Sequence, residues 1–249
     1  MIQIIKNFKN KDINPFIWIF FPIFIPLFFL FVKLINVHFF INFFQGENGI
    51  IENGTFLILF FAILISISSL KEIKNKFKKK NLLLIIIFFT LGLIYFAGEE
   101  INWGQHWFHW ESTKFFEIYN DQYIKNISET NFHNISSWFD QKPKILLIFF
   151  VLFGGIFCPF YYSINKNIHN LKYWIFPNIY CFPTALICLF FYLLDNSYKF
   201  LCYGRPGIDI KCKYIPSILH FRTSEIIELY IAFFLLIYIL SINLRLKKI

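Results

Sequence analysis

Residues 82–100 read LLLIIIFFTLGLIYFAGEE, an uncharged apolar run followed by two adjacent carboxylates, Glu99 and Glu100. The apolar part, 82–97, is near the length that an α-helix needs to cross about 30 Å of hydrocarbon. A carboxylate at the mouth of such a helix costs roughly 2–3 kcal/mol if it points into lipid. We therefore expect a membrane-spanning helix whose acidic end faces protein, a watery cavity or the headgroup layer.

The rest of the chain has the same apolar character. Of its 249 residues, 57% are hydrophobic and 22% aromatic, and 37 of them are Phe. A soluble domain could not bury that much apolar surface beneath a polar skin, whereas a bilayer solvates it. The sequence predicts a single polytopic membrane domain, an all-α bundle of about six transmembrane helices. The predicted spans are approximately 15–36, 54–70, 82–98, 145–163, 173–194 and 226–243.

The segment 99–143 separates the third and fourth predicted spans and is rich in aromatic residues. Trp and Tyr rings combine an apolar body with a polar tip and favour the membrane–water interface. We therefore expect an interfacial helical segment on the outer side of the membrane. The rings concerned are Trp103, Trp107, Trp110, Phe115, Phe116 and Tyr119.

The basic residues indicate which way the spans run. Six alternating spans place the lysines of 71–80, those of 166–172 and the basic C-terminus on the face that carries both termini. Of the 15 acidic residues, only Asp12 and Glu72 join them there. The positive-inside tendency makes that face cytoplasmic. The net charge of +9 thus reflects topology and anionic lipid, and no nucleic-acid recognition motif accompanies it. The expected partner is the lipid bilayer and not nucleic acid.

The cysteines divide by position. Cys158, Cys181 and Cys188 fall in predicted spans, where Cys packs as a small apolar residue. Cys202 and Cys212 fall in the predicted outer loop 195–223. An oxidising compartment would let these two form a disulfide, and two free thiols are the alternative.

Acidic residues flank other spans on the outer side. Glu52 precedes the second span, and Glu225 and Glu228 open the sixth on one helical face. Favourable interaction with the helix dipole explains these three equally well, because they lie near helix N-termini. Glu99 and Glu100 instead close a helix, where negative charge needs a cation, a proton or water to offset it.

Imidazole and guanidinium groups complete the candidate site. Carboxylate with imidazole is a ligand set for zinc or another divalent metal, and the same groups serve as general acid and base. His106 and His109 are either ligands or ordinary interfacial residues, and His133 lies in ETNFHN (129–134). Arg205 and Arg222 could hold a phosphate headgroup by bidentate contacts, or Arg222 could simply pair with a carboxylate.

The sequence GEEINWGQHWFHWES (98–112), followed by ETNFHN, resembles a GEEISWGQ…ETNLHN pattern in a group of uncharacterised bacterial multi-span membrane proteins. The resemblance implies a protein of the bacterial inner (cytoplasmic) membrane and implies no activity. That pattern has Arg where this chain has His106, which makes His133 the better imidazole. Carried over by position, the residues of interest are Glu52, Glu99, Glu100, Trp103, Gln105, Glu129, Asn131, His133 and Asn134.

Two hypotheses follow. In the first, a non-catalytic multi-pass protein uses an acidic, histidine-containing polar site at the outer face to bind a cation or polar ligand, or to hold helix ends together. In the second, a metal-assisted hydrolase or transferase acts on a lipid or lipid-linked substrate. Its catalytic residues would be Glu52, Glu99, Glu100 and His133, with Glu99, Glu100 and His133 holding the metal. Its substrate-binding residues would be Trp103, Gln105, Asn131, Asn134, Arg205 and Arg222.

Overall fold

The computed structural model describes residues 13–45, 49–77, 80–119, 130, 132, 135, 137–164, 170–203 and 223–248. Within these ranges the chain forms helices and the turns that link them, with no strand. Six helices are long and apolar enough to cross a membrane, and each overlaps one predicted span, which confirms the all-α membrane bundle. They are Phe16–Ile35, Ile50–Lys76, Lys80–Glu100, Lys142–Tyr161, Leu171–Ser197 and Thr223–Lys247.

Several spans contain short π- or 3₁₀-helical pieces (η) beside regular α-helix. In chain order the spans consist of η2 (Phe16–Phe20) with α2 (Phe21–Ile35); α4 (Ile50–Glu72) with η3 (Ile73–Phe77); α5 (Lys80–Glu100); α8 (Ser137–Leu152), η5 (Phe153–Phe157) and α9 (Cys158–Ile164); α10 (Leu171–Ile175), η6 (Ile179–Cys181) and α11 (Phe182–Tyr203); and α12 (Thr223–Lys247). Between spans lie α3 (Val37–Phe43), η4 (Asn102–Gly104), α6 (Gln105–Phe108) and α7 (Lys114–Tyr119).

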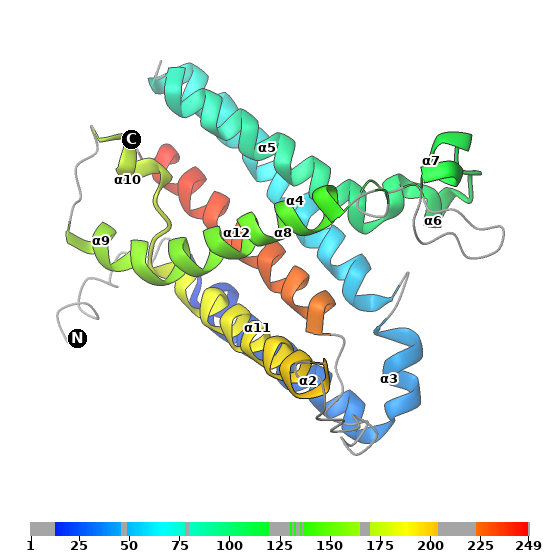
Figure 1. Cartoon of the computed structure of the whole chain (residues 1–249). Coiled ribbons are helices and arrows are strands. Elements are labelled where there is room, and N and C mark those ends of the chain that lie inside the picture. The colour runs from blue at the N-terminus through cyan, green and yellow to red at the C-terminus, as the bar shows by residue number, and fades with distance from the viewer. Residues whose placement is uncertain are drawn as a thin grey trace.

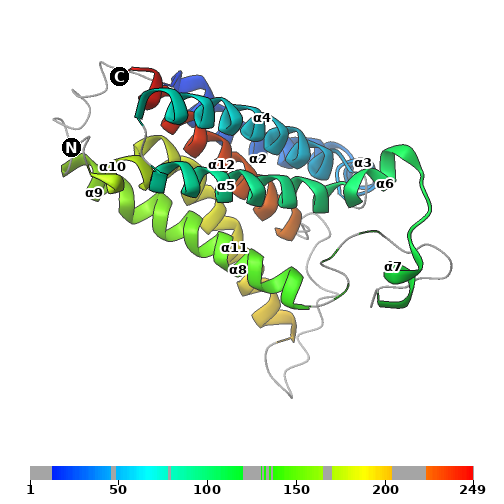
Figure 2. The same ribbon diagram turned by 90° about the horizontal axis from the view of Figure 1, so that it is seen from above.

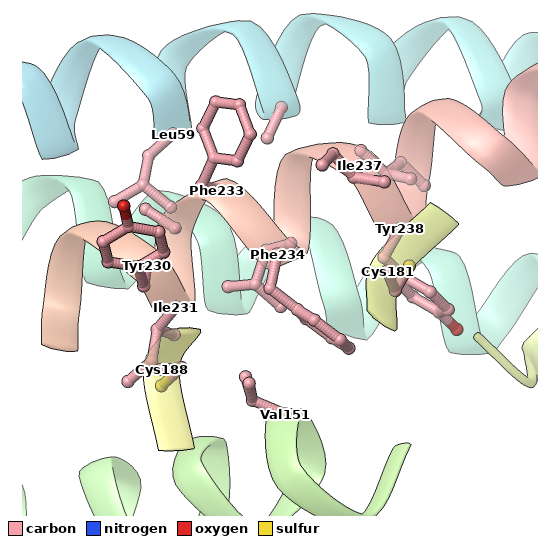
Figure 3. Close-up of a cluster of buried hydrophobic side chains, with 14 of the residues drawn as sticks. Leu59, Val151, Cys181, Cys188, Tyr230, Ile231, Phe233, Phe234, Ile237 and Tyr238 are labelled. Atoms are coloured by element: carbon pink, nitrogen blue, oxygen red, sulfur yellow. The ribbon is translucent and has the colours of Figure 1, made fainter. Parts of the chain in front are cut away.

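The last helix, α12, forms the centre of the bundle (Figures 1 and 2). Most of its side chains are buried, and it packs mainly against α4 and α11. Figure 3 shows Phe234 and Tyr238 of α12 among side chains from the surrounding helices. Cys158, Cys181 and Cys188 are free and buried, as predicted.

A close approach of backbones joins the fourth span to this core. Gly155 lies in the π-helical turn η5. A Cβ added there would lie 2.3 Å from the Cβ of Ala185 on α11 and 2.7 Å from the ring of Phe234 on α12. Glycine therefore lets three helices meet at a distance that any larger residue would prevent.

Hydroxyl and amide contacts fix α4 against both of its neighbours. The amide of Asn243 on α12 donates to Oγ of Ser69 at 3.0 Å. The hydroxyls of Ser66 on α4 and Thr90 on α5 are hydrogen-bonded at 2.7 Å. Such contacts hold helices in register within an apolar bundle. This register fixes the start of α4, the end of α5 and the start of α12 relative to one another at the other end of the bundle.

The two ends of the bundle differ in the segments they carry. The α4–α5 connection, α9, α10 and the end of α12 lie at one end, and α3, α6, α7 and the start of α12 lie at the other (Figures 1 and 2). The first group is the lysine-rich end and the second is the acidic end of the sequence analysis. The side of the membrane that each end faces stays a prediction.

Candidate functional site

Glu99 is buried, with 8% of its surface exposed, although it is the penultimate residue of α5. Its Oε1 accepts a hydrogen bond from the indole N–H of Trp103 at 2.8 Å. Its Oε2 accepts one from the backbone N–H of Phe132 at 2.9 Å. A buried carboxylate requires such donors. Because Phe132 belongs to ETNFHN, Glu99 links the two parts of the sequence pattern.

The turn after α5 folds Trp103 back over the helix end. Asn102, Trp103 and Gly104 have successive positive φ angles of 47°, 54° and 91°. Residues with side chains occupy this left-handed region at a cost of about 1–3 kcal/mol each, and they do so mainly where the surroundings enforce it. Gly98 makes room for the indole, since a Cβ there would lie 2.9 Å from ring atoms of Trp103. The hydrogen bond to Glu99 helps to hold this turn.

Two further contacts hold the outer segment, one within it and one to α4. The side-chain oxygen of Gln105 accepts a hydrogen bond from the backbone N–H of Thr130 at 2.7 Å. The indole N–H of Trp107 donates to Oδ1 of Asn53, near the start of α4, at 3.2 Å. The Trp107 ring also packs edge-on against Phe56, with centroids 4.8 Å apart. The spacing of Glu99, Trp103, Gln105 and Trp107 in this chain therefore has a structural use.

Glu100 has different neighbours from Glu99. It lies within electrostatic range of Glu228 on α12, Glu52 on α4, Lys144 on α8 and Glu225 on α12. The Nζ of Lys144 donates to Oε1 of Glu228 at 2.6 Å, which joins α8 to α12 by an ion pair. We call these five side chains the carboxylate cluster. Its carboxylates outnumber its single ammonium, so a cation, protons or hydrogen-bond donors must offset the excess negative charge.

The predicted site residues are thus divided between two arrangements. Glu52 and Glu100 belong to the carboxylate cluster, whereas Glu99, Trp103 and Gln105 hold the turn after α5 and the residues around Phe132. Other candidates lie outside the described residues, or only their backbone is described. The former are His133, Asn131, Asn134, Arg205, Arg222 and Cys212, and the latter are His106 and Cys202.

The described ranges contain no complete ligand set for a metal ion. No three His, Cys, Asp or Glu side chains there lie close enough together to hold a metal ion. Both oxygens of Glu99, one of the predicted ligands, already accept hydrogen bonds from protein N–H groups. A metal site at this end of the bundle would need His133, His106 or another side chain that the structure does not describe.

Lys144 is the functional candidate that the sequence analysis missed. It follows Pro143 at the start of the fourth span, on the side predicted to be outer. A lysine there runs against the positive-inside tendency, and that mismatch was an available signal. A basic residue close to a span on the outer side is explained when it pairs with an acidic residue of another helix.

Comparisons of the chain with protein-family models, with curated proteins and with solved structures return no match. The fold itself defines the class as a multi-pass α-helical membrane protein. The resemblance carried by residues 98–134 stays a prediction.

Proposed function

We propose that this membrane protein uses the carboxylate cluster to bind the polar head group of a lipid or lipid-linked molecule at the outer membrane face. One observation carries the proposal: Glu100 lies within electrostatic range of carboxylates from two other helices. Among the described residues of the cluster, the one cation, Lys144, is already ion-paired with Glu228. Negative charge gathered from separate helices attracts a ligand that brings positive charge or hydrogen-bond donors.

The charge of the cluster indicates the chemistry of the ligand. Carboxylates accept hydrogen bonds and attract cations, so they favour an ammonium or hydroxyl-rich head group over a free phosphate. Lys144 stands beside them and suits the phosphate that an ammonium-bearing phospholipid also carries. The side chains of Lys144 and Glu228 are 30% and 26% exposed, so a ligand can reach them.

Phosphatidylethanolamine and phosphatidylcholine form a matched pair of probes. Both head groups are zwitterionic, but only the first has ammonium N–H donors. We expect native mass spectrometry of the purified full chain to retain phosphatidylethanolamine several-fold better. Glu100→Gln should reduce that retention to the phosphatidylcholine level, whereas Glu111→Gln, an exposed position outside the cluster, should leave it unchanged. Equal retention of the two lipids by the wild-type chain would contradict the proposal.

A membrane hydrolase or transferase acting on a lipid or lipid-linked substrate is the second candidate. The same observation favours it, because carboxylates that share a poorly solvated site can serve as a paired general acid and base. Glu100 and its neighbours Glu52 and Glu228 would take those roles. Profiling lipids and glycolipids in cells with the wild-type chain, with Glu100→Gln and without the protein tests it. A lipid species that changes in the same way in the last two strains supports turnover.

The metal-assisted form of that enzyme has a separate test. Elemental analysis of the purified wild-type chain and of the Glu99→Ala/Glu100→Ala variant measures bound divalent metal. Stoichiometric zinc or another metal in the wild type, lost in the variant, supports it. The absence of metal from both proteins would exclude the metal-assisted mechanism. Acid–base chemistry by carboxylates alone would then remain.

A further inference from the structure

The segment after α5 exposes large apolar side chains outside the spans. Within α6 and α7 and near them, exposed fractions reach 77% for Phe108 and 73% for Ile118. Large apolar side chains grouped at such exposure are uncommon in water and mark a contact with an apolar partner. We define the outer aromatic face by its exposed members, Trp107, Phe108, Phe115, Ile118 and Tyr119.

The helix α7 is apolar on two faces. Phe116 is buried and packs edge-on against Phe132, with ring centroids 5.4 Å apart. This contact attaches one face of α7 to the residues that Glu99 also holds. Phe115, Ile118 and Tyr119 lie three and four residues apart, which places them together on the other face. One side of α7 therefore faces protein, and the other side needs a second apolar partner.

The position of α6 and α7 indicates that this partner is lipid. In both views they lie past the outer end of α5, apart from the packed spans (Figures 1 and 2). The helix α5, which ends next to this segment, exposes Leu91 and Ile94 on its surface. At the same end, Trp138 on α8 is 70% exposed. The outer aromatic face thus lies at the end of a span with exposed apolar side chains, and Trp and Tyr are the residues of the headgroup layer.

We propose that the outer aromatic face inserts into the boundary between head groups and acyl chains in the outer leaflet. The sequence predicts an interfacial segment from composition, and the structure identifies the side chains that enter the lipid. Trp107 also binds Asn53 on α4, so the inserted face is fixed to the same helix that carries Glu52. The insertion holds the turn after α5, and with it Glu100, at a constant depth. This inference does not depend on which ligand the carboxylate cluster binds.

Photo-crosslinking tests the contact in the otherwise unchanged chain. Benzoylphenylalanine is placed at position 108 or 118, and at 111 as the control, because Glu111 is an exposed polar residue of the same segment. The protein is reconstituted in nanodiscs of phosphatidylcholine and phosphatidylglycerol and irradiated. We expect lipid adducts by mass spectrometry at 108 and 118, several-fold more abundant than at 111. Adducts to a second copy of the chain, or equal yields at all three positions, would overturn the proposal.

A depth measurement gives an independent result. Ile118→Cys and Glu111→Cys are labelled with a nitroxide; the buried native cysteines, Cys158, Cys181 and Cys188, are shielded from the reagent by the fold. Both variants also carry Cys202→Ser and Cys212→Ser, which prevents background labelling at those two positions. We expect the label at 118 to collide preferentially with oxygen, which concentrates in lipid, and the label at 111 to collide with a water-soluble nickel chelate. The same nickel preference at both positions would show that the face lies in water.

Discussion

The indole N–H of Trp103 donates a hydrogen bond to Oε1 of Glu99 across a turn in which three successive residues have positive φ. The other oxygen of Glu99 holds the backbone of Phe132. Glu100, the next residue, instead lies near carboxylates of α4 and α12. Successive residues of a helix are separated by about 100° around its axis. Adjacent glutamates can therefore serve two different structures, a backbone anchor and a charged cluster.

Gly98→Ala should destabilise the turn after α5. The added methyl group would lie 2.9 Å from the Trp103 ring, so the ring must move and its bond to Glu99 is lost. We expect a loss of about 1–3 kcal/mol, measured as a lower thermal midpoint in detergent and faster proteolysis of the outer segment. Gly92→Ala is the matched control, since a Cβ there meets nothing within 4 Å and the same helix should be unchanged or slightly more stable. Equal effects of the two substitutions would refute the packing argument.

Trp103→Phe and Glu99→Gln should interact in a double-mutant cycle. Trp103→Phe removes the N–H donor, and Glu99→Gln leaves one acceptor oxygen for the two N–H groups that the carboxylate binds. We expect each single change to cost about 1–3 kcal/mol. The double variant should lose clearly less than the sum of the two, because the interaction can be lost only once. Denaturant titration measures the free energy of unfolding of the wild type, the two single variants and the double variant. Additive losses would mean that the two side chains act independently.

Lys144→Met should destabilise the junction of α8 and α12. It leaves Glu228 among carboxylates without its ion-pair partner, and we expect a loss of about 1–2 kcal/mol for this partly exposed pair. Adding Glu228→Gln should restore most of the loss in thermal stability. Lys142→Met is the control: this exposed lysine lies over the Trp138 ring at 5.5 Å and should matter less. A stability change at 142 as large as that at 144 would argue against a specific pair.

Gly155→Ala should be among the most damaging small substitutions in the spans. Its methyl group would overlap Ala185 and Phe234 on two different helices, with an expected cost of about 3 kcal/mol or more. Ala185→Gly in the same chain should recover part of the folded yield, because it removes the closer of the two atoms. Fluorescence-detected size-exclusion chromatography of the expressed protein reports that yield. Normal yield of the single variant would show that the helices separate easily.

The membrane orientation can be read by cysteine labelling in intact cells. With Cys202 and Cys212 replaced by Ser, we expect Glu111→Cys to react with a membrane-impermeant maleimide added outside. Lys74→Cys, in η3 at the lysine-rich end of the second span, should react only after the cells are opened. The lysine-rich end faces the cytoplasm in this prediction. The reverse pattern would place the carboxylate cluster on the cytoplasmic side.

The spans follow from local sequence because the length and hydropathy of a segment suffice to define a membrane-crossing helix. The predicted span 82–98 lies within Lys80–Glu100, and the predicted span 226–243 lies within Thr223–Lys247. The sequence also indicated that Glu99 and Glu100 have partners, because charged residues at the mouth of an apolar helix need them. Which partners those are did not follow from spacing. Glu99 turned out to bind protein N–H groups, and the cation near Glu100 came from Lys144.

The packing order of the helices could not be predicted from these residues. The spans Ile50–Lys76 and Thr223–Lys247 have the same mean hydropathy, 2.2, yet 28% of the first and 83% of the second is buried within the bundle. Lipid tails are as apolar as the bundle interior, so hydrophobicity does not distinguish a lipid-facing side chain from a buried one. Contacts between distant segments, such as Gly155 against Ala185 and Asn243 against Ser69, make that distinction. They exist only once the chain has assembled, and they bring the ends of α4, α5, α8 and α12 together around Glu100.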